Sequence, residues 1–140
     1  MRPCCLAIML QIALASAALA ADPVRYIGIY VQPYYQAART PADRPQVAVG
    51  EGISGLLAST RRQDIEAARD RIVSDPALVT PMTLMVLAIR LYDVGLRDDA
   101  VLWFYAAKDR FITLAEVVDV RASGLAQVED AVKSFATLAG

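Results

Sequence analysis

The stretch from residue 82 to residue 94 constrains the fold more than any other part of the chain. It is apolar except for Thr83, Arg90 and Asp93, and its length is that of an ordinary globular helix. A helix that is apolar on nearly all sides is surrounded by other elements. We therefore expect this helix at the centre of a compact multi-helix domain.

Both ends of this predicted helix carry boundary signals. Thr80 is a residue type that caps helix N-termini, and Pro81 suits the first helical turn. Gly95 follows the last apolar residue and can take the left-handed conformation that ends many helices. The sequence thus predicts a helix that begins after Thr80 and ends before Gly95.

Further helical patterns lie on both sides of the central helix. Asp98 is expected to cap the helix that follows Gly95. Val73 and Leu138 are expected on the apolar faces of their helices. The predicted helical segments cover residues 53–59, 64–73, 98–111, 117–120 and 125–138.

The N-terminal part of the mature chain has a different pattern. Residues 25–31 alternate between β-branched residues and others, which predicts a short strand, and residues 46–49 form a second candidate. Tyr26, Tyr30 and Tyr34 also lie four apart, as on one face of a helix, so a helix is the alternative. The predicted fold class is mainly α, with one or two short N-terminal strands as an accessory.

Residues 1–20 have the pattern of a secretory signal peptide. Arg2 supplies a positive charge, an apolar run follows, and Ala18 and Ala20 are small residues at the positions that a signal peptidase recognises. A lipid-modified cysteine would follow the apolar run, whereas Cys4 and Cys5 precede it. We expect three parts: a signal peptide (1–20), an extended arm (21–49) and a helical domain (50–140).

Composition excludes several classes of site. The chain has no histidine, which removes Ser-His-Asp and Cys-His nucleophile systems and the zinc-protease helix motif. Without residues 1–20 it has no cysteine, hence no disulfide in the periplasmic or secreted location that the signal peptide predicts. The formal net charge of −1 and the lack of a basic run do not suggest nucleic acid or a membrane surface. We therefore expect no metal site and no cofactor. After removal of the signal peptide, we also expect no membrane anchor.

Large and small residues recur at fixed spacing between residues 82 and 112. They are Leu87, Ala88, Leu91, Gly95, Ala100, Phe104 and Ala107, and the run from 100 to 107 reads AVLWFYAA. This spacing resembles a tetratricopeptide-type helical hairpin, and the run is similar to the Sel-like relatives of that family. Tyr92 is one place from the usual aromatic position, and no second copy follows. The resemblance implies a scaffold that binds proteins. The alternative explanation of the pattern is general helix packing, because any two helices that pack closely need a glycine turn between them and a small residue where they cross.

Arg90 is a charge inside an otherwise apolar helix. An unpaired buried charge is unfavourable, so Arg90 either pairs with Asp93 and a backbone carbonyl or opens onto a binding surface. We include Arg90 among the candidate binding residues.

Four of the six tyrosines fall within ten residues of the N-terminal arm: Tyr26, Tyr30, Tyr34 and Tyr35. Tyrosine supplies rigid contact area with a polar tip and is favoured at protein interfaces. The alternative is that the rings cover the helical core. The tyrosines complete the set of candidate binding residues.

Two functional hypotheses follow. In the first, the chain is a periplasmic or secreted module that binds another protein, such as an inhibitor or immunity protein for an envelope-directed toxin. In the second, it is a small hydrolase of cell-envelope material that works through carboxylates such as Glu51, which lies between two glycines. The first hypothesis is favoured, because no motif of catalytic spacing accompanies Glu51.

Overall fold

The structure is a computed structural model that describes residues 24–122 and 125–139. The predicted signal peptide lies outside the described residues. The elements are β1 (Tyr35–Gln36), β2 (Gln46–Val47), α1 (Ser54–Leu57), α2 (Arg62–Ser74), the 3-10 helix η1 (Pro76–Leu78), α3 (Pro81–Asp93), α4 (Arg97–Ala115) and α5 (Ala126–Ala139).

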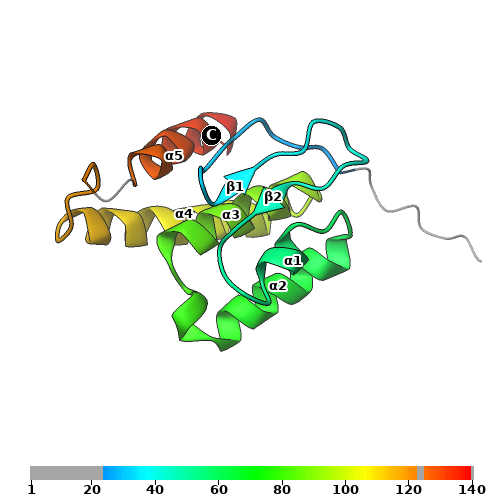
Figure 1. Ribbon diagram of the computed structural model, residues 1–140, viewed down its shortest axis with the longest axis horizontal. Coiled ribbons are helices and arrows are strands. Elements are labelled where there is room, and N and C mark those ends of the chain that lie inside the picture. Colours follow the sequence, from blue (N-terminus) through cyan, green and yellow to red (C-terminus); the bar gives the residue numbers. More distant parts are fainter. Residues whose placement is uncertain (1–23, 123–124, 140) are drawn as a thin grey trace, which may run out of the picture.

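Helix α3 forms the centre of the domain, as the sequence predicts. Its residues from Thr83 to Leu91 are all buried. α3 contacts α1, α2, α4 and α5, with α1 and α2 to one side of the α3 and α4 pair and α5 to the other (Figure 1). The mainly helical fold class with two short strands is confirmed.

Both predicted boundaries of α3 are confirmed. The Thr80 side chain accepts a hydrogen bond from the Thr83 amide at 3.1 Å. At the other end Gly95 has φ of +84°, and the amides of Gly95 and Leu96 donate to the carbonyls of Tyr92 and Leu91. This pair of bonds is a Schellman motif, and glycine takes its left-handed conformation without steric penalty.

The other helices differ from the prediction at particular residues. Asp98 lies in the first turn of α4, and Leu96 occupies the N-cap position instead. Val73 is exposed because it is rotated by about 100° from Ile72, which is buried. Leu138 in the last turn of α5 is also exposed.

Residues 117–120 form turns, so the helix predicted there is wrong. The amides of Val117 and Val118 both donate to the carbonyl of Leu114. Beyond them the Asp119 side chain accepts hydrogen bonds from the amides of Arg121 and Ala122. Such local bonding of an aspartate competes with continuation of a helix.

The strand predicted at residues 25–31 is also wrong, and so is the helical alternative. Only Val31 makes a bridge, to Tyr35. The amides of Arg25 and Ile27 donate to Asp93 of α3 instead of to a neighbouring strand. The strand pair lies further along, where Tyr35 is opposite Val47 and Gln36 opposite Gln46 in antiparallel register. The second candidate, 46–49, therefore forms a strand over its first half.

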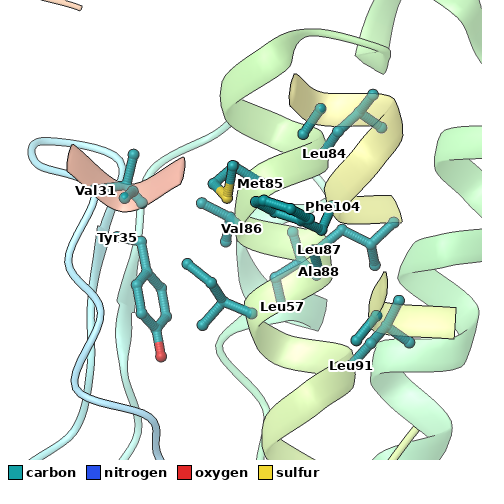
Figure 2. Packing of buried hydrophobic residues seen from close by; sticks show 14 of the residues in the cluster. Val31, Tyr35, Leu57, Leu84, Met85, Val86, Leu87, Ala88, Leu91 and Phe104 are labelled. Atoms are coloured by element: carbon teal, nitrogen blue, oxygen red, sulfur yellow. The ribbon is translucent and has the colours of Figure 1, made fainter. Parts of the chain in front are cut away.

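The N-terminal segment supplies part of the core. Val31 and Tyr35 face Met85 and Val86 of α3, with Leu57 beside them (Figure 2). On the α5 side, Phe104 of α4 and Phe135 of α5 stack with ring centroids 4.7 Å apart. The segment from residue 24 to residue 49 and the helices thus share one hydrophobic core.

Candidate functional site

Arg90 and Asp93 lie one turn apart at the C-terminal end of α3, and both are fully buried. Nη1 of Arg90 donates to Oδ2 of Asp93, which forms an ion pair. A buried charge of either sign needs a partner of this kind. Of the two alternatives for Arg90, the structure shows the ion pair with Asp93, and the Arg90 side chain is not accessible at the surface.

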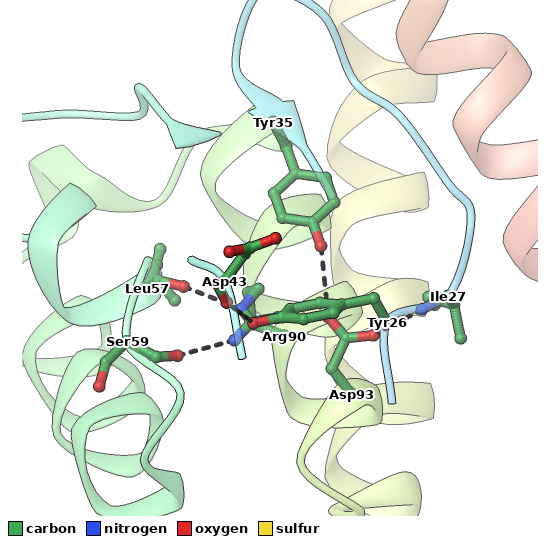
Figure 3. A network of polar contacts seen from close by, with 8 residues as sticks. All are labelled: Tyr26, Ile27, Tyr35, Asp43, Leu57, Ser59, Arg90 and Asp93. Atoms are coloured by element: carbon green, nitrogen blue, oxygen red, sulfur yellow. Dashed lines mark hydrogen bonds and ion pairs between the residues drawn. The ribbon is translucent and has the colours of Figure 1, made fainter. Parts of the chain in front are cut away.

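The two remaining hydrogen bonds of Arg90 fix the chain between α1 and α2. Nε donates to the carbonyl of Leu57 at 2.8 Å, and Nη2 donates to the carbonyl of Ser59 at 2.7 Å (Figure 3). Lysine also has three N–H donors, but all three are on one nitrogen, whereas the acceptors around Arg90 are bonded to three separate nitrogens of the planar guanidinium. This geometry explains why arginine stands at position 90.

Asp93 binds the N-terminal segment. Its Oδ1 accepts a hydrogen bond from the Ile27 amide at 2.8 Å, and its Oδ2 accepts one from the Tyr35 hydroxyl at 3.2 Å. The main-chain carbonyl of Asp93 accepts another from the Arg25 amide at 3.1 Å. Burial raises the pKa of Asp93 to about 6, although the Arg90 charge and these hydrogen bonds oppose the shift.

Tyr26 covers the ion pair. Its ring lies over the Arg90 guanidinium at 5.1 Å from the ring centroid, and its hydroxyl donates to the carbonyl of Asp43 at 2.6 Å (Figure 3). Burial raises the pKa of the Tyr26 hydroxyl and, more strongly, that of Tyr35. Both phenols are therefore neutral donors at physiological pH.

We call the group of Tyr26, Tyr35, Arg90 and Asp93 the clamp. It joins three segments that are distant in the sequence: the arm, the link between α1 and α2, and the end of α3. Among the described residues, every buried side-chain nitrogen or oxygen has a hydrogen-bond partner. The clamp is thus a saturated network that holds the arm in place.

The five candidate binding residues are separated by the fold. Tyr26, Tyr35 and Arg90 meet in the clamp, and Tyr35 and Arg90 are fully buried. Tyr34 is half-buried against the core. Tyr30 alone of the five is largely accessible, with 50% of its surface exposed. These tyrosines are close in sequence, but their side chains lie in different environments: Tyr26 and Tyr35 contact the ion pair, whereas Tyr30 is exposed.

Glu51, the candidate for hydrolysis, is exposed in the turn before α1. In the described part of the chain, no group of three or more aspartate, glutamate, cysteine or histidine side chains could hold a metal ion. The buried carboxylate of Asp93 is the other chemically distinctive acid, but both of its oxygens are engaged.

One surface feature escaped the sequence analysis. Leu102, Tyr105 and Ile112 of α4 are exposed by 64%, 54% and 47%. They lie opposite the buried face that Ala100, Phe104, Ala107 and Phe111 form. The sequence contains the pattern, since spacings of three and seven residues place these side chains on one face of a helix. The buried face of the same helix has the stronger apolar pattern, and the prediction used that face alone.

The chain is 37% identical over 106 residues to an uncharacterized protein of Haemophilus influenzae. The match covers 76% of this chain and 41% of that relative, so the chain spans about two fifths of the relative's length. No family model and no solved structure matches the chain. No helix within residues 24–122 and 125–139 is both long enough and apolar enough to span a membrane.

Proposed function

We propose that this chain is a periplasmic or secreted module that binds another protein. The proposal includes the tetratricopeptide-like character of residues 82–112. Its support is the order of helix packing: each helix contacts the next, and α1, α3 and α5 also contact one another in sequence. Stacked helical hairpins have this contact pattern, and proteins built from them act as binding surfaces.

The observation that carries the proposal is the way in which the clamp holds the arm. Main-chain and side-chain bonds to Asp93 fix residues 25–35, and Tyr30 projects from this fixed segment into solvent. A surface that is ordered before binding loses less conformational freedom when a partner arrives. An exposed tyrosine on an ordered segment is typical of a binding residue.

Within this class, the finer hypothesis is an inhibitor or immunity protein for an envelope-directed toxin. The predicted signal peptide supports it, because such a toxin acts in the compartment that the signal peptide predicts. Among the described residues, no observation favours the alternative hydrolase. We therefore do not propose a second function.

The test compares two tyrosines of similar exposure on different surfaces. Tagged wild-type protein, Tyr30→Ser and Tyr105→Ser are used to capture proteins from the periplasmic fraction of the native host. We expect a partner that binds the wild type and Tyr105→Ser but not Tyr30→Ser, with little change in melting temperature, because Tyr30 is half-exposed. The double variant Tyr30→Ser, Tyr34→Ser should show the same loss.

Two results would contradict the proposal. One is a set of captured proteins that is the same for all variants. The other is a large fall in the melting temperature of Tyr30→Ser, which would show that Tyr30 belongs to the core and has no role in binding.

A further inference from the structure

A polar hollow lies beside the strand pair of β1 and β2. Its lining comes from residues 36–39, 43, 44 and 46, which belong to the two strands and to the loop that joins them. Its volume is about 400 Å³, near the lower end of the range for small-ligand pockets. A hollow of this size fits a small molecule or the end of a chain. We call it the loop hollow.

Two glutamines form the strand side of the loop hollow. Gln36 and Gln46 are opposite each other in the antiparallel register. Successive side chains of a strand point to opposite faces, and the neighbouring Tyr35 is buried in the core, so both glutamines point away from the core. Each side-chain amide offers donors and an acceptor to a ligand.

The loop side of the hollow is held by hydrogen bonds. The Thr40 hydroxyl donates to Oδ2 of Asp43 at 2.9 Å, and the Asp43 amide donates to the carbonyl of Thr40 at 3.1 Å. The Tyr26 hydroxyl donates to the carbonyl of Asp43 at 2.6 Å, which joins the loop to the clamp (Figure 3). The loop is therefore in place before a ligand arrives, and binding loses less conformational entropy.

Two arginines give the loop hollow its charge. Arg39 and Arg44 line it and are exposed, and neither forms an ion pair within residues 24–122 and 125–139. Among the described lining residues, Asp43 supplies the one negative charge. Two guanidinium groups and one carboxylate leave a net charge of +1 in the lining.

These groups match a ligand that has one carboxylate next to an amide. Guanidinium groups bind a carboxylate through paired N–H···O bonds. The net charge of +1 suits one negative charge, whereas Asp43 repels the second charge of a phosphate. The Asp43 carboxylate accepts from Thr40 and has further lone pairs for an N–H of the ligand. The C-terminus of a peptide has this combination of groups.

We propose that the loop hollow binds the C-terminal residue of a peptide. Arg39 and Arg44 hold the terminal carboxylate, and Asp43 accepts the N–H of the last peptide bond. Gln36 and Gln46 bond to the carbonyl and N–H of the preceding peptide bond. Recognition of a C-terminal carboxylate is a known mode of peptide binding. The site goes beyond the proposed function, because it uses neither Tyr30 nor a folded partner surface.

Titration of the purified, isotope-labelled protein with acetyl-alanyl-alanine, followed by amide NMR, tests the proposal. The small side chains of this peptide suit the small volume of the hollow. We expect a dissociation constant of about 0.1–1 mM, and shifts centred on residues 36–46 and on the side-chain amides of Gln36 and Gln46. The same peptide with a C-terminal amide should bind about tenfold more weakly or not at all, because it lacks the carboxylate.

Charge variants test the two arginines. Arg39→Gln and Arg44→Gln should each weaken binding of the peptide by about tenfold, and the double variant should abolish it. The matched control is Arg121→Gln, which removes the same charge from an exposed residue outside the loop hollow. It should bind the peptide as the wild type does. The melting temperatures of all four variants should stay close to that of the wild type, because the replaced side chains are exposed.

Asp43→Asn separates a peptide site from a general anion site. In the wild type, inorganic phosphate and acetate should both bind more weakly than the peptide, since phosphate is repelled by Asp43 and acetate has no peptide bond. Asp43→Asn removes the repulsion and weakens the acceptor for the peptide N–H. The variant should therefore increase the affinity for phosphate by a larger factor than the affinity for the peptide.

The proposal is wrong if the peptide causes no shifts at residues 36–46 up to about 10 mM, well above the weakest affinity that we expect. It is also wrong if the amidated peptide binds equally well, if the double arginine variant keeps its affinity, or if phosphate binds the wild type more tightly than the peptide. Because the probe is a short peptide, these results are separate from the capture of a partner through Tyr30.

Discussion

Replacement of Arg90 tests whether the clamp holds the domain together. Arg90→Met keeps the apolar stem of the side chain but removes three hydrogen bonds: to Asp93 and to the carbonyls of Leu57 and Ser59. Three acceptors then remain in a region without water contact, one of them a charged carboxylate. Removal of one partner of a buried ion pair typically costs about 3–5 kcal/mol.

Two opposing effects decide where in this range the value falls. Methionine avoids the desolvation of a guanidinium, which favours the variant. The unpaired carbonyls and carboxylate oppose folding, and Asp93 can reduce its own penalty by taking up a proton. We expect a net loss of about 3–5 kcal/mol, which is a large part of the 5–15 kcal/mol that stabilises an ordinary domain.

Urea unfolding followed by helix circular dichroism measures this loss. The matched control is Arg62→Met, because Arg62 forms an exposed ion pair with Glu66 on α2. Exposed pairs of this kind contribute less than about 1 kcal/mol. Arg90→Lys should lie between the two, since it keeps a positive charge near Asp93 but loses most of the contacts to the carbonyls.

A loss below about 1 kcal/mol for Arg90→Met, or a loss equal to that of Arg62→Met, would refute the reasoning. Where Arg90→Met is too unstable to purify, the lysine variant provides the measurement. Faster hydrogen exchange at the Ile27 amide in Arg90→Lys would show that the arm loosens with the clamp, because that amide is bonded to Asp93.

Three further outcomes are expected. Because the pKa of Asp93 is raised from 3.8 to about 6, the folded state binds a proton more tightly than the unfolded state. The free energy of unfolding of the wild type should therefore fall by about 2 kcal/mol relative to that of Asp93→Asn as pH rises from about 4 to about 6, measured by urea unfolding at each pH. Gly95→Val should lower the melting temperature by several degrees, since valine is strained at φ of +84°. Intact-mass measurement of exported protein should show a chain that begins at Ala21; retention of residues 1–20 would contradict the predicted cleavage.

The sequence was sufficient for α3 because its signals are local. Thr80 and Gly95 act through their own backbone and their nearest neighbours, so their roles can be predicted without knowledge of the rest of the fold. The pairing of Arg90 with Asp93 is also local, since one helical turn separates them. Local chemistry of this kind needs no tertiary information.

The errors arose where an apolar pattern has more than one structural explanation. Alternation in residues 25–31 is typical of a strand, but an extended segment that lies across a helix buries alternate side chains in the same way. The difference lies in the main-chain partners, because the amides of Arg25 and Ile27 bond to Asp93. No pattern in the arm itself could reveal an acceptor that lies 66 residues away.

The same reasoning explains why an ionic clamp stands where apolar residues could have packed. Replacement of a buried ion pair by apolar side chains often leaves stability unchanged, so stability alone does not account for the clamp. Within residues 24–49 the strand ladder of the arm has two residue pairs, Tyr35 with Val47 and Gln36 with Gln46, and so short a ladder specifies register weakly. The Asp93 carboxylate accepts hydrogen bonds from the amide of Ile27 and the hydroxyl of Tyr35. These two bonds together define a single position of the arm on α3. We infer that the clamp contributes specificity: it selects one arrangement of the arm and therefore one direction in which Tyr30 is presented.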